Sequence, residues 1–306
     1  MMSTTKLETS SLRELYPFES NWLDLDGIRY HYLDEGPRTA PPVLMLHGNP
    51  TWSFYYRTLI PGLSQAYRVV VPDHVGCGLS DKPQDAGRAR PYYTLEQHIQ
   101  NLEALVDHLD LRHLTLVLHD WGGPIGMGYA TRHPENVSQF IVLNTAAFVQ
   151  PTLPQRIKMC RYPLWGDLLV RGLNAFAGLA LSWAVCHRER MTPKVRAGYL
   201  LPYDSWQSRI AILRFVQDIP LEDKHRSRRL LEQIEANLYL FEQHPMLIIW
   251  GARDFCFTVR GFLSGWQERF PYAETKVIED AGHYVVEDAH ERMLPWMLEF
   301  MGRRGG

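Results

Sequence analysis

The feature that most constrains this chain is a series of short apolar runs that lack polar alternation and are separated by stretches of helical character. A strand with one face in water alternates apolar and polar residues, whereas a strand covered on both faces is apolar throughout. The runs therefore predict a parallel sheet between two layers of helices. They occupy residues 43–46, 68–71, 114–118 and 140–143, and strand-like segments at 246–250 and 275–278 continue the series.

The segments between these runs have helical patterns. We expect helices over 52–63, 94–109, 124–133, 227–241 and 259–270, and a last helix from Val285. The turn Asp26-Gly27 between two short apolar segments predicts a β-hairpin. Because strands and helices alternate, the sequence predicts an α/β fold with right-handed crossovers and a mostly parallel, doubly wound sheet.

This alternation stops after Asn144. Residues 151–223 contain no clear strand and are rich in Pro, Leu, Trp and Arg, which predicts several short helices separated by breakers. We therefore divide the chain into a first core part (1–150), a helical cap or lid (151–223) and a second core part (224–306). Apolar residues of the insert fit a lid that lines a greasy pocket, although we expect more than half of them simply to dock the lid.

Composition narrows the class of protein. The 306 residues carry 32 basic and 34 acidic side chains, a formal charge of -2 that argues against nucleic acid or an anionic membrane as the main partner. The four cysteines have no metal-ligand spacing, the start has no signal-peptide pattern, and the apolar run 175–186 is too short to span a bilayer. We expect a cytoplasmic enzyme with no metal, no cofactor and no membrane span.

The most informative segment is Leu-His-Asp-Trp-Gly-Gly at 118–123, directly after a predicted strand. A strand that turns sharply into a helix with small residues is typical of a nucleophile elbow, and here Asp120 takes the place of serine. Leu118 departs from the usual small residue at the first position. Asp120 could alternatively be only the N-cap of the next helix.

Two further motifs follow predicted strands. In His-Gly-Asn-Pro at 47–50, the loop would supply one backbone N–H of an oxyanion hole from Asn49, and Trp121 would supply the second. An ordinary Gly-Asn-Pro turn is the alternative. Asp254 and His283 each follow a later strand, so the chain order is nucleophile, acid, base. His283 alone could be one of thirteen ordinary histidines, but three motifs in the right order favour a catalytic triad.

From Trp22 to the last helix, the sequence resembles the haloalkane dehalogenases of the α/β-hydrolase superfamily. The matching stretches are 47–53, Asp73 with 76–83, 119–123, and the Asp254 and His283 motifs. The resemblance implies an α/β-hydrolase fold with Asp120 as nucleophile, His283 as base and Asp254 as its partner. It also implies that Asn49 and Trp121 stabilise the departing halide. Some members place the acid after the sixth strand, where this chain has Asn144, so Asp254 is the better choice.

The Asn/Trp pair with a late Asp is similar to the third dehalogenase subfamily. That group also resembles the β-lactone decarboxylases of bacterial long-chain olefin biosynthesis, which have the same five residues. The first expectation is hydrolytic cleavage of a carbon–halogen bond through an Asp-alkyl ester, giving alcohol and halide from a small apolar substrate. The alternative is decarboxylation of a cis-β-lactone (a cis-2-oxetanone). The natural substrate stays open, as does a homo-oligomer or multi-enzyme assembly.

The sequence leaves other activities of the superfamily open. Epoxide hydrolases resemble this chain but need two lid tyrosines, for which Tyr162, Tyr199 and Tyr203 are candidates. Fluoroacetate dehalogenases usually carry Arg after the nucleophile, whereas Trp121 indicates a neutral, carbon-rich substrate. A ligand-binding protein without turnover is the last alternative.

The residue types suit displacement at a saturated carbon. A carboxylate with an ordinary pKa of about 3.9 is ionised at neutral pH, whereas serine would have to lose a proton first. The indole N–H of Trp121 and the amide of Asn49 are uncharged donors that stabilise a leaving anion without trapping it.

Overall fold

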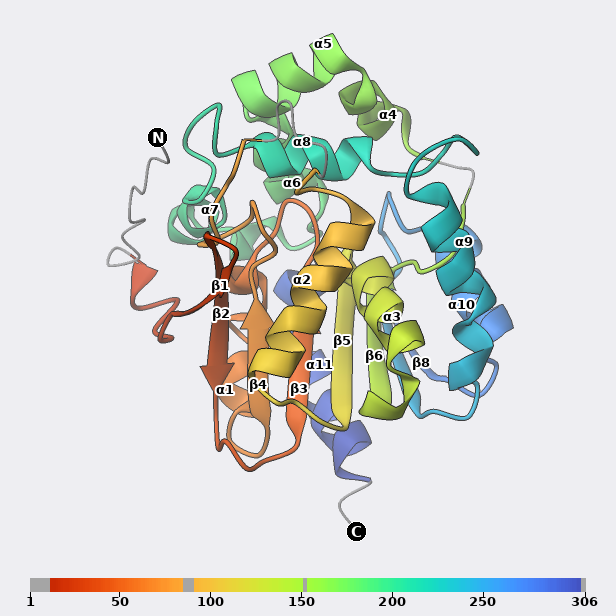
Figure 1. Ribbon diagram of the computed structural model, residues 1–306. Coiled ribbons are helices and arrows are strands. Elements are labelled where there is room, and N and C mark those ends of the chain that lie inside the picture. The colour runs from red at the N-terminus through yellow and green to blue at the C-terminus, as the bar shows by residue number, and fades with distance from the viewer. Residues whose placement is uncertain (1–11, 85–90, 151–152, 304–306) are drawn as a thin grey trace.

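In the residues that the structure describes (12–84, 91–150 and 153–303), eight strands form one sheet in the order β1-β2-β4-β3-β5-β6-β7-β8. The computed structural model is shown in Figure 1. The strands are β1 (Asn21–Leu25), β2 (Ile28–Glu35), β3 (Pro42–Leu46), β4 (Arg68–Pro72), β5 (Leu114–Asp120), β6 (Val137–Thr145), β7 (Met246–Gly251) and β8 (Glu274–Ile278). Only the pairs β1–β2 and β2–β4 are antiparallel. The predicted mostly parallel sheet is confirmed, and the hairpin at Asp26-Gly27 has positive φ at both residues.

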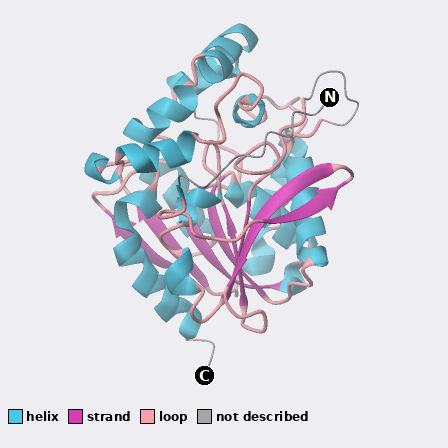
Figure 2. Cartoon of the chain, turned by 90° about the vertical axis from the view of Figure 1, so that its left-hand side faces the viewer, coloured by secondary structure: helices cyan, strands magenta, loops and turns pink. Residues whose placement is uncertain are grey.

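Helices cover both faces of this sheet, as the side view in Figure 2 shows. The α-helices are α1 (Ile60–Leu63), α2 (Leu95–His108), α3 (Gly122–Arg132), α4 (Gln155–Arg161), α5 (Pro163–Gly166), α6 (Ala175–Trp183), α7 (Pro193–Leu200), α8 (Ile210–Gln217), α9 (Arg228–Ala236), α10 (Ser264–Arg269) and α11 (Val285–Gly302). Short 3-10 helices are η2 (Ser53–Tyr56), η3 (Pro134–Asn136), η5 (Arg188–Arg190) and η6 (Leu238–Phe241), and short π-helices are η4 (Asp167–Gly172) and η7 (Val259–Leu263).

Successive side chains of a strand point to opposite faces of the sheet, so a continuous apolar run places apolar side chains on both faces. In β3, Leu44 and Leu46 join the core that contains side chains of α2 and α3, whereas Val43 and Met45 join the core that contains side chains of α1 and α11. All four are fully buried. Both faces of β3 are therefore covered, which is why polar residues are missing from it.

One expected helix is wrong. Residues 52–63 form η2, a break, and the single turn α1 rather than one helix. Pro61 has no N–H to bond the carbonyl of Arg57, so a continuous helix cannot pass through this point. At the start of the segment the N–H of Ser53 donates to Asp73 Oδ1 at 2.6 Å, which fixes this turn to the loop after β4. The helices expected over 227–241 and 259–270 are each divided into an α part and an η part.

Helices α4 to α8 lie between β6 and β7 in the chain, and no strand occurs in the described residues between those two strands. Figure 1 places these helices above the sheet, at the edge where the parallel strands end. They share a small apolar core of their own, formed by Ile157, Cys160, Val170, Ala177, Tyr203, Ile212, Leu213 and Val216. Ligands of open α/β sheets bind at the carboxyl ends of the strands, so the layer covers the expected position of a site.

Candidate active site

Asp120 is the last residue of β5 and adopts φ of 50°, a left-handed conformation that Asp tolerates better than most residues. The chain then enters α3 at Gly122. The backbone N–H of Asn49 donates to Asp120 Oδ1 at 2.6 Å, and the backbone N–H of Trp121 also hydrogen-bonds this carboxylate. The sharp strand-to-helix turn predicted for Asp120 is therefore present, and its carboxylate faces the loop after β3.

Glycines make the room for this turn. A Cβ at Gly48 would lie 2.0 Å from Asp120 Oδ1, and one at Gly122 would lie 2.1 Å from the carbonyl oxygen of Leu46. Leu118 is larger than the residue usual at this position, and Gly126 of α3 makes room for it. A Cβ at Gly126 would lie only 2.3 Å from the Leu118 side chain.

His283 brings the other two predicted catalytic residues together. Its Nε2 lies 3.6 Å from Asp120 Oδ2, and its Nδ1 lies 2.7 Å from Asp254 Oδ2. Because a carboxylate only accepts, the proton sits on Nδ1 and Nε2 faces Asp120. The ring also stacks on Phe257 with centroids 5.4 Å apart. Three residues that are distant in sequence therefore form an Asp–His–Asp arrangement.

Asn144, which the sequence excluded as an acid, has a different part in this arrangement. Its Nδ2 donates to Asp254 Oδ2 at 3.0 Å and to the carbonyl of Gly251 at 3.1 Å, and its Oδ1 accepts from the N–H of Gly251 at 2.8 Å. The other oxygen of Asp254 accepts from the N–H groups of Cys256 and Phe257 at 2.6 and 3.0 Å. Asn144 therefore orients Asp254, a role that the sequence reasoning missed.

The charges of the site act on one another. Burial raises the pKa of Asp120, and the charge of His283 together with the N–H groups of Asn49 and Trp121 opposes this rise. For His283, burial by itself lowers the pKa, but the charges of Asp254 and Asp120 and the hydrogen bond to Asp254 outweigh it, so that the pKa is raised. A substrate bond to Asp120 would remove one of these two negative charges and lower the pKa of His283 again.

Asn49 and Trp121 lie beside this carboxylate on the pocket wall. The side-chain Nδ2 of Asn49 donates to the carbonyl of Ile212 in α8 at 3.1 Å, and its second hydrogen stays available. Trp121 packs against Phe215 with ring centroids 5.2 Å apart. Asn49 and Trp121 therefore both contact α8 as well as the Asp120 carboxylate.

A cavity of about 370 Å³ connects these residues with the layer of helices. Asp120, Trp121, Asn49 and His283 are at its base, and its remaining wall is almost entirely apolar. The helices α4, α6 and α8 contribute Arg156, Ile157, Met159, Cys160, Ala175, Phe176, Leu179, Ala180, Trp183 and Val216. Such a cavity suits a carbon-rich substrate with one polar group held at the base.

The tyrosines considered for an epoxide do not belong to this cavity. The hydroxyl of Tyr199 donates to Glu287 at 2.5 Å, that of Tyr203 lies 3.4 Å from the carbonyl of Thr51, and Tyr162 is 62% exposed. None of the three is among the residues that line the cavity. The geometry gives no support to epoxide hydrolysis.

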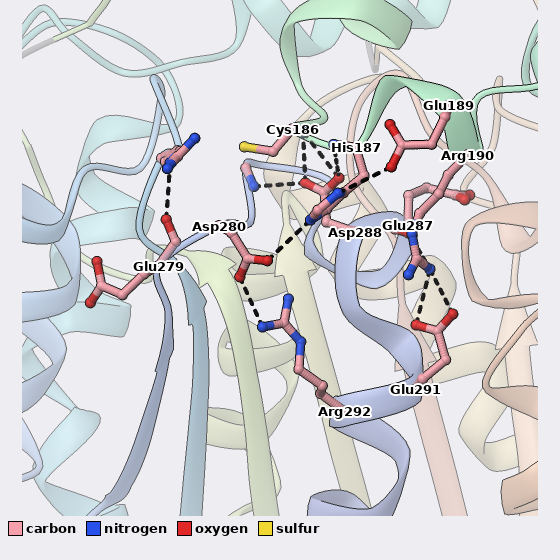
Figure 3. Close-up of polar contacts among 12 residues, drawn as sticks. Cys186, His187, Glu189, Arg190, Glu279, Asp280, Glu287, Asp288, Glu291 and Arg292 are labelled. Carbon is pink, nitrogen blue, oxygen red and sulfur yellow. Dashed lines mark hydrogen bonds and ion pairs between the residues drawn. The ribbon is translucent and has the colours of Figure 1, made fainter.

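Asp288, in the first turn of α11, joins the loop before that helix to the residues after α6, and Figure 3 shows it beside Cys186 and His187. Its buried carboxylate accepts from the backbone N–H groups of Cys186, His187 and Gly282 at 2.8 to 3.0 Å. The sequence analysis did not identify this residue. An acidic residue in the first turn of the helix that follows His283 is the signal that could have found it.

Comparison with known proteins identifies the family. A family model described as the alpha/beta hydrolase fold matches residues 41–184. Proteins named cis-3-alkyl-4-alkyloxetan-2-one decarboxylase from Shewanella oneidensis and Xanthomonas campestris are 46% and 44% identical, covering 95% and 94% of this chain and 90% and 97% of theirs. Haloalkane dehalogenase 2 of Mycobacterium tuberculosis is 32% identical over 94% of this chain and 97% of its own. The chain belongs to the haloalkane dehalogenase family of α/β-hydrolases.

Solved structures of the haloalkane dehalogenase family agree with the fold. The dehalogenase DatA of Agrobacterium tumefaciens superposes with a TM-score of 0.81 at 26% identity, covering 93% of this chain and 96% of its own. DpaA of Paraglaciecola agarilytica, described as tetrameric, superposes with a TM-score of 0.77 at 25% identity, covering 97% and 96%. Both activities expected from the sequence are therefore found among relatives of this family member. Within the described residues, no group of three or more His, Cys, Asp or Glu side chains is placed to hold a metal ion.

Proposed function

We propose that this enzyme decarboxylates cis-3,4-dialkyl-β-lactones to alkenes, with hydrolytic dehalogenation of haloalkanes as a second activity of the same site. The observation that carries this order is the identity of 46% and 44% to the decarboxylases against 32% to a dehalogenase, each over nearly the whole chain. The cavity wall, to which α4 and α6 contribute mostly apolar side chains, supports a substrate with alkyl chains.

Asp120 begins the reaction as nucleophile. One of its oxygens attacks C4 of the lactone, the saturated ring carbon that bears the ring oxygen. The C4–O bond breaks, and its electron pair becomes part of a free carboxylate at C3. Asn49 Nδ2 and Trp121 Nε1 donate hydrogen bonds to this leaving carboxylate, where charge develops. Protonated His283, 3.6 Å from Asp120, offsets the two negative charges that the site then contains.

Loss of carbon dioxide completes the reaction. The electrons of the bond between C3 and the carboxylate form the C3=C4 double bond, and the bond from C4 to Asp120 breaks to regenerate its carboxylate. The products are an alkene and CO₂, and no water or external proton is consumed. Inversion at C4 followed by anti elimination converts a cis-lactone into a cis-alkene.

A haloalkane uses the same first step and a different second one. Asp120 displaces the halide, which Asn49 and Trp121 stabilise, and an alkyl ester remains. Esterification removes one negative charge beside His283, so the pKa of the imidazole falls and the ring can accept a proton from water. Asp254 holds its orientation, and the backbone N–H groups of Asn49 and Trp121 stabilise the tetrahedral oxyanion.

Residues 151–223 act in this proposal as the cap of a core formed by 1–150 and 224–306. Their inner faces line the cavity, and several hydrogen bonds join them to the catalytic loops, among them those between Asn49 and Ile212 and between Asp288 and Cys186. The cap would therefore exclude water from Asp120 while the lactone reacts, which matters because water would hydrolyse the ester.

Water labelled with ¹⁸O separates the two reactions. We expect a long-chain cis-β-lactone to be converted to cis-alkene with no label in Asp120, because no water attacks the ester. Turnover of 1-bromobutane should place ¹⁸O in the Asp120 carboxylate, and His283→Phe should retain a butyl adduct on Asp120 by intact mass. Rapid halide release from 1-bromobutane, without alkene formation from the lactone, would make dehalogenation the main activity of the enzyme. If His283→Phe carried no butyl adduct, Asp120 would not be the nucleophile.

A further inference from the structure

The cap has an outer surface unlike the rest of the molecule. Nine of the fourteen large apolar side chains that are exposed in the described residues belong to it, although it is about a quarter of the chain. Six of them lie on or directly beside α4, α5 and η4, which contact each other, and we call these six the cap ridge. The cap ridge consists of Met159 (47% exposed), Tyr162 (62%), Leu164 (87%), Trp165 (55%), Leu168 (50%) and Leu173 (65%).

The cap ridge lies at one end of the molecule, where Figure 1 shows α4 and α5 at the top. Apolar patches of this kind are uncommon on proteins that have no partner. The neighbouring residues Tyr162, Pro163, Leu164 and Trp165 also border a shallow surface depression. Trp and Tyr beside aliphatic side chains are typical of surfaces that enter the boundary between lipid headgroups and acyl chains.

Charge is distributed unevenly between cap and core. Residues 151–223 contain ten basic and six acidic side chains, whereas the remaining residues contain twenty-two basic and twenty-eight acidic ones. The cap therefore carries a net positive charge and the core a net negative one. The two nearly cancel in the whole-chain charge, from which we argued against an anionic membrane. Exposed Arg156 and Lys158 accompany the cap ridge, and two further cations beside it are paired with acids, Arg161 with Glu222 and Arg171 with Asp167.

The cap ridge is also continuous with the substrate cavity. Met159 belongs to the ridge and lines the cavity, and Leu179 and Trp183 of α6 line it while remaining 42% and 44% exposed. An apolar molecule could thus pass between the surface and Asp120 along apolar side chains. This continuity indicates a surface from which an apolar substrate or product is exchanged.

From these observations we infer that the cap ridge docks this enzyme on the surface of an anionic lipid bilayer. A bilayer offers acyl chains to the apolar side chains and negative headgroups to the basic ones. A second copy would instead bring two positive caps together, which charge repulsion opposes. The inference goes beyond the proposed function, because binding to lipid does not depend on which substrate reacts.

The cap would lie on the bilayer rather than cross it. No single helix of the described residues has the length and hydropathy of a membrane span, and one pair, Pro163–Gly172 with Ala175–Trp183, passes that test together with a bend of 71°. Val170, Ala177 and Leu181 of this pair are buried inside the protein. Only its outer face is free for lipid, which is the arrangement of an interfacial helix.

Co-sedimentation of the full chain with vesicles tests this inference. We expect binding to vesicles of phosphatidylglycerol and phosphatidylcholine in equal parts, and weaker binding to phosphatidylcholine alone and at high salt. Tyr162→Ser with Leu164→Ser should weaken binding about tenfold, since neither residue would bury its side chain in lipid. Lys158→Gln should weaken it about fivefold.

The core offers a matched control. Tyr239 and Tyr272 are 61% and 87% exposed, nearly the values of Tyr162 and Leu164, but they lie outside the cap. Tyr239→Ser with Tyr272→Ser should bind vesicles as the unchanged protein does. Halide release from 1-bromobutane should be the same in both double variants, which shows that the fold is intact and keeps this result separate from lactone turnover.

Three results would overturn the inference. The first is no sedimentation with either vesicle, and the second is equal loss of binding in the cap and core double variants. The third is a concentration-dependent dimer that the cap double variant abolishes, without vesicle binding, which would identify a second copy as the occupant.

Discussion

The two sides of the cavity are built in opposite ways. On the core side, directional bonds fix the polar side chains: the carboxylate of Asp254 accepts four hydrogen bonds, and Asp120 accepts from two backbone N–H groups. On the cap side, the wall is made of apolar side chains such as Leu179 and Trp183, which are more than 40% exposed and are held by contacts without direction.

This difference separates two properties of the enzyme. In the proposed mechanism, directional bonds at Asp120, His283 and Asp254 hold the reacting atoms in place, so changes on the core side should lower kcat. Contacts of the cap with an alkyl chain are similar in the ground state and the transition state, so changes there should raise KM with little effect on kcat. Each variant below tests one side of this division.

The largest effect is expected for Asp120→Asn. Asparagine has the same shape and tolerates the positive φ of this position, but it is not an anionic nucleophile. Turnover of both the lactone and the bromoalkane should fall by about 10⁴-fold or more. Intact mass must show that the amide has not reverted to Asp. Normal rates with the amide intact would place the nucleophile elsewhere.

Trp121→Phe should have the next largest effect. It removes one N–H donor for the leaving anion while keeping an aromatic ring against Phe215. Loss of one such donor costs about 10²-fold in kcat elsewhere. We expect a similar loss for both substrates with a small change in KM, measured by steady-state kinetics. A rise of KM with unchanged kcat would mean that Trp121, like the cap residues, binds the substrate without stabilising the leaving anion.

The parts that could be predicted from sequence depend on local signals. The continuous apolar run of β5 and the small residues after it were sufficient for the elbow at Asp120, because strand, turn and helix are adjacent in the chain. The hairpin at Asp26-Gly27 is local in the same sense. The break in the helix expected at 52–63 has one local cause, Pro61, which the sequence contains, and one distant cause, the bond of Ser53 to Asp73 twenty residues later, which it does not reveal.

The part of Asn144 could not be predicted because it depends on the sheet order. Its bonds to Asp254 and Gly251 arise because β6 and β7 are neighbours, although more than a hundred residues separate these positions. The sequence could not show whether Tyr162, Tyr199 and Tyr203 face the cavity, for a similar reason. Only the packing of the short helices decides which of their faces point into it. The positive cap was overlooked because the charge was summed over the whole chain.

The pH dependence of the two reactions should differ. Hydrolysis of the alkyl ester needs neutral His283, so bromoalkane turnover should fall about tenfold per pH unit below the pKa of that imidazole in the ester. Lactone decarboxylation needs ionised Asp120 and protonated rather than neutral His283. Burial raises the pKa of Asp120, but the charge of His283 and the N–H donors oppose this rise. The ratio of lactone to bromoalkane turnover should therefore increase as the pH falls. Parallel profiles for kcat would show that both reactions need the same proton acceptor.

The smallest effect is expected on the cap side, for Leu179→Ala. This side chain lines the cavity and is 42% exposed, so its removal takes away part of an alkyl contact and leaves the protein core unchanged. At about 0.8 kcal/mol per buried methylene, KM for a long-chain lactone should rise about fivefold with kcat unchanged. The matched core variant is Leu118→Ala, a fully buried leucine under the elbow, which should lower the free energy of unfolding by about 2–5 kcal/mol. If Leu179→Ala lowered kcat as strongly as Trp121→Phe, the cap would take part in positioning the reacting atoms, because a contact shared by ground state and transition state cannot change kcat alone.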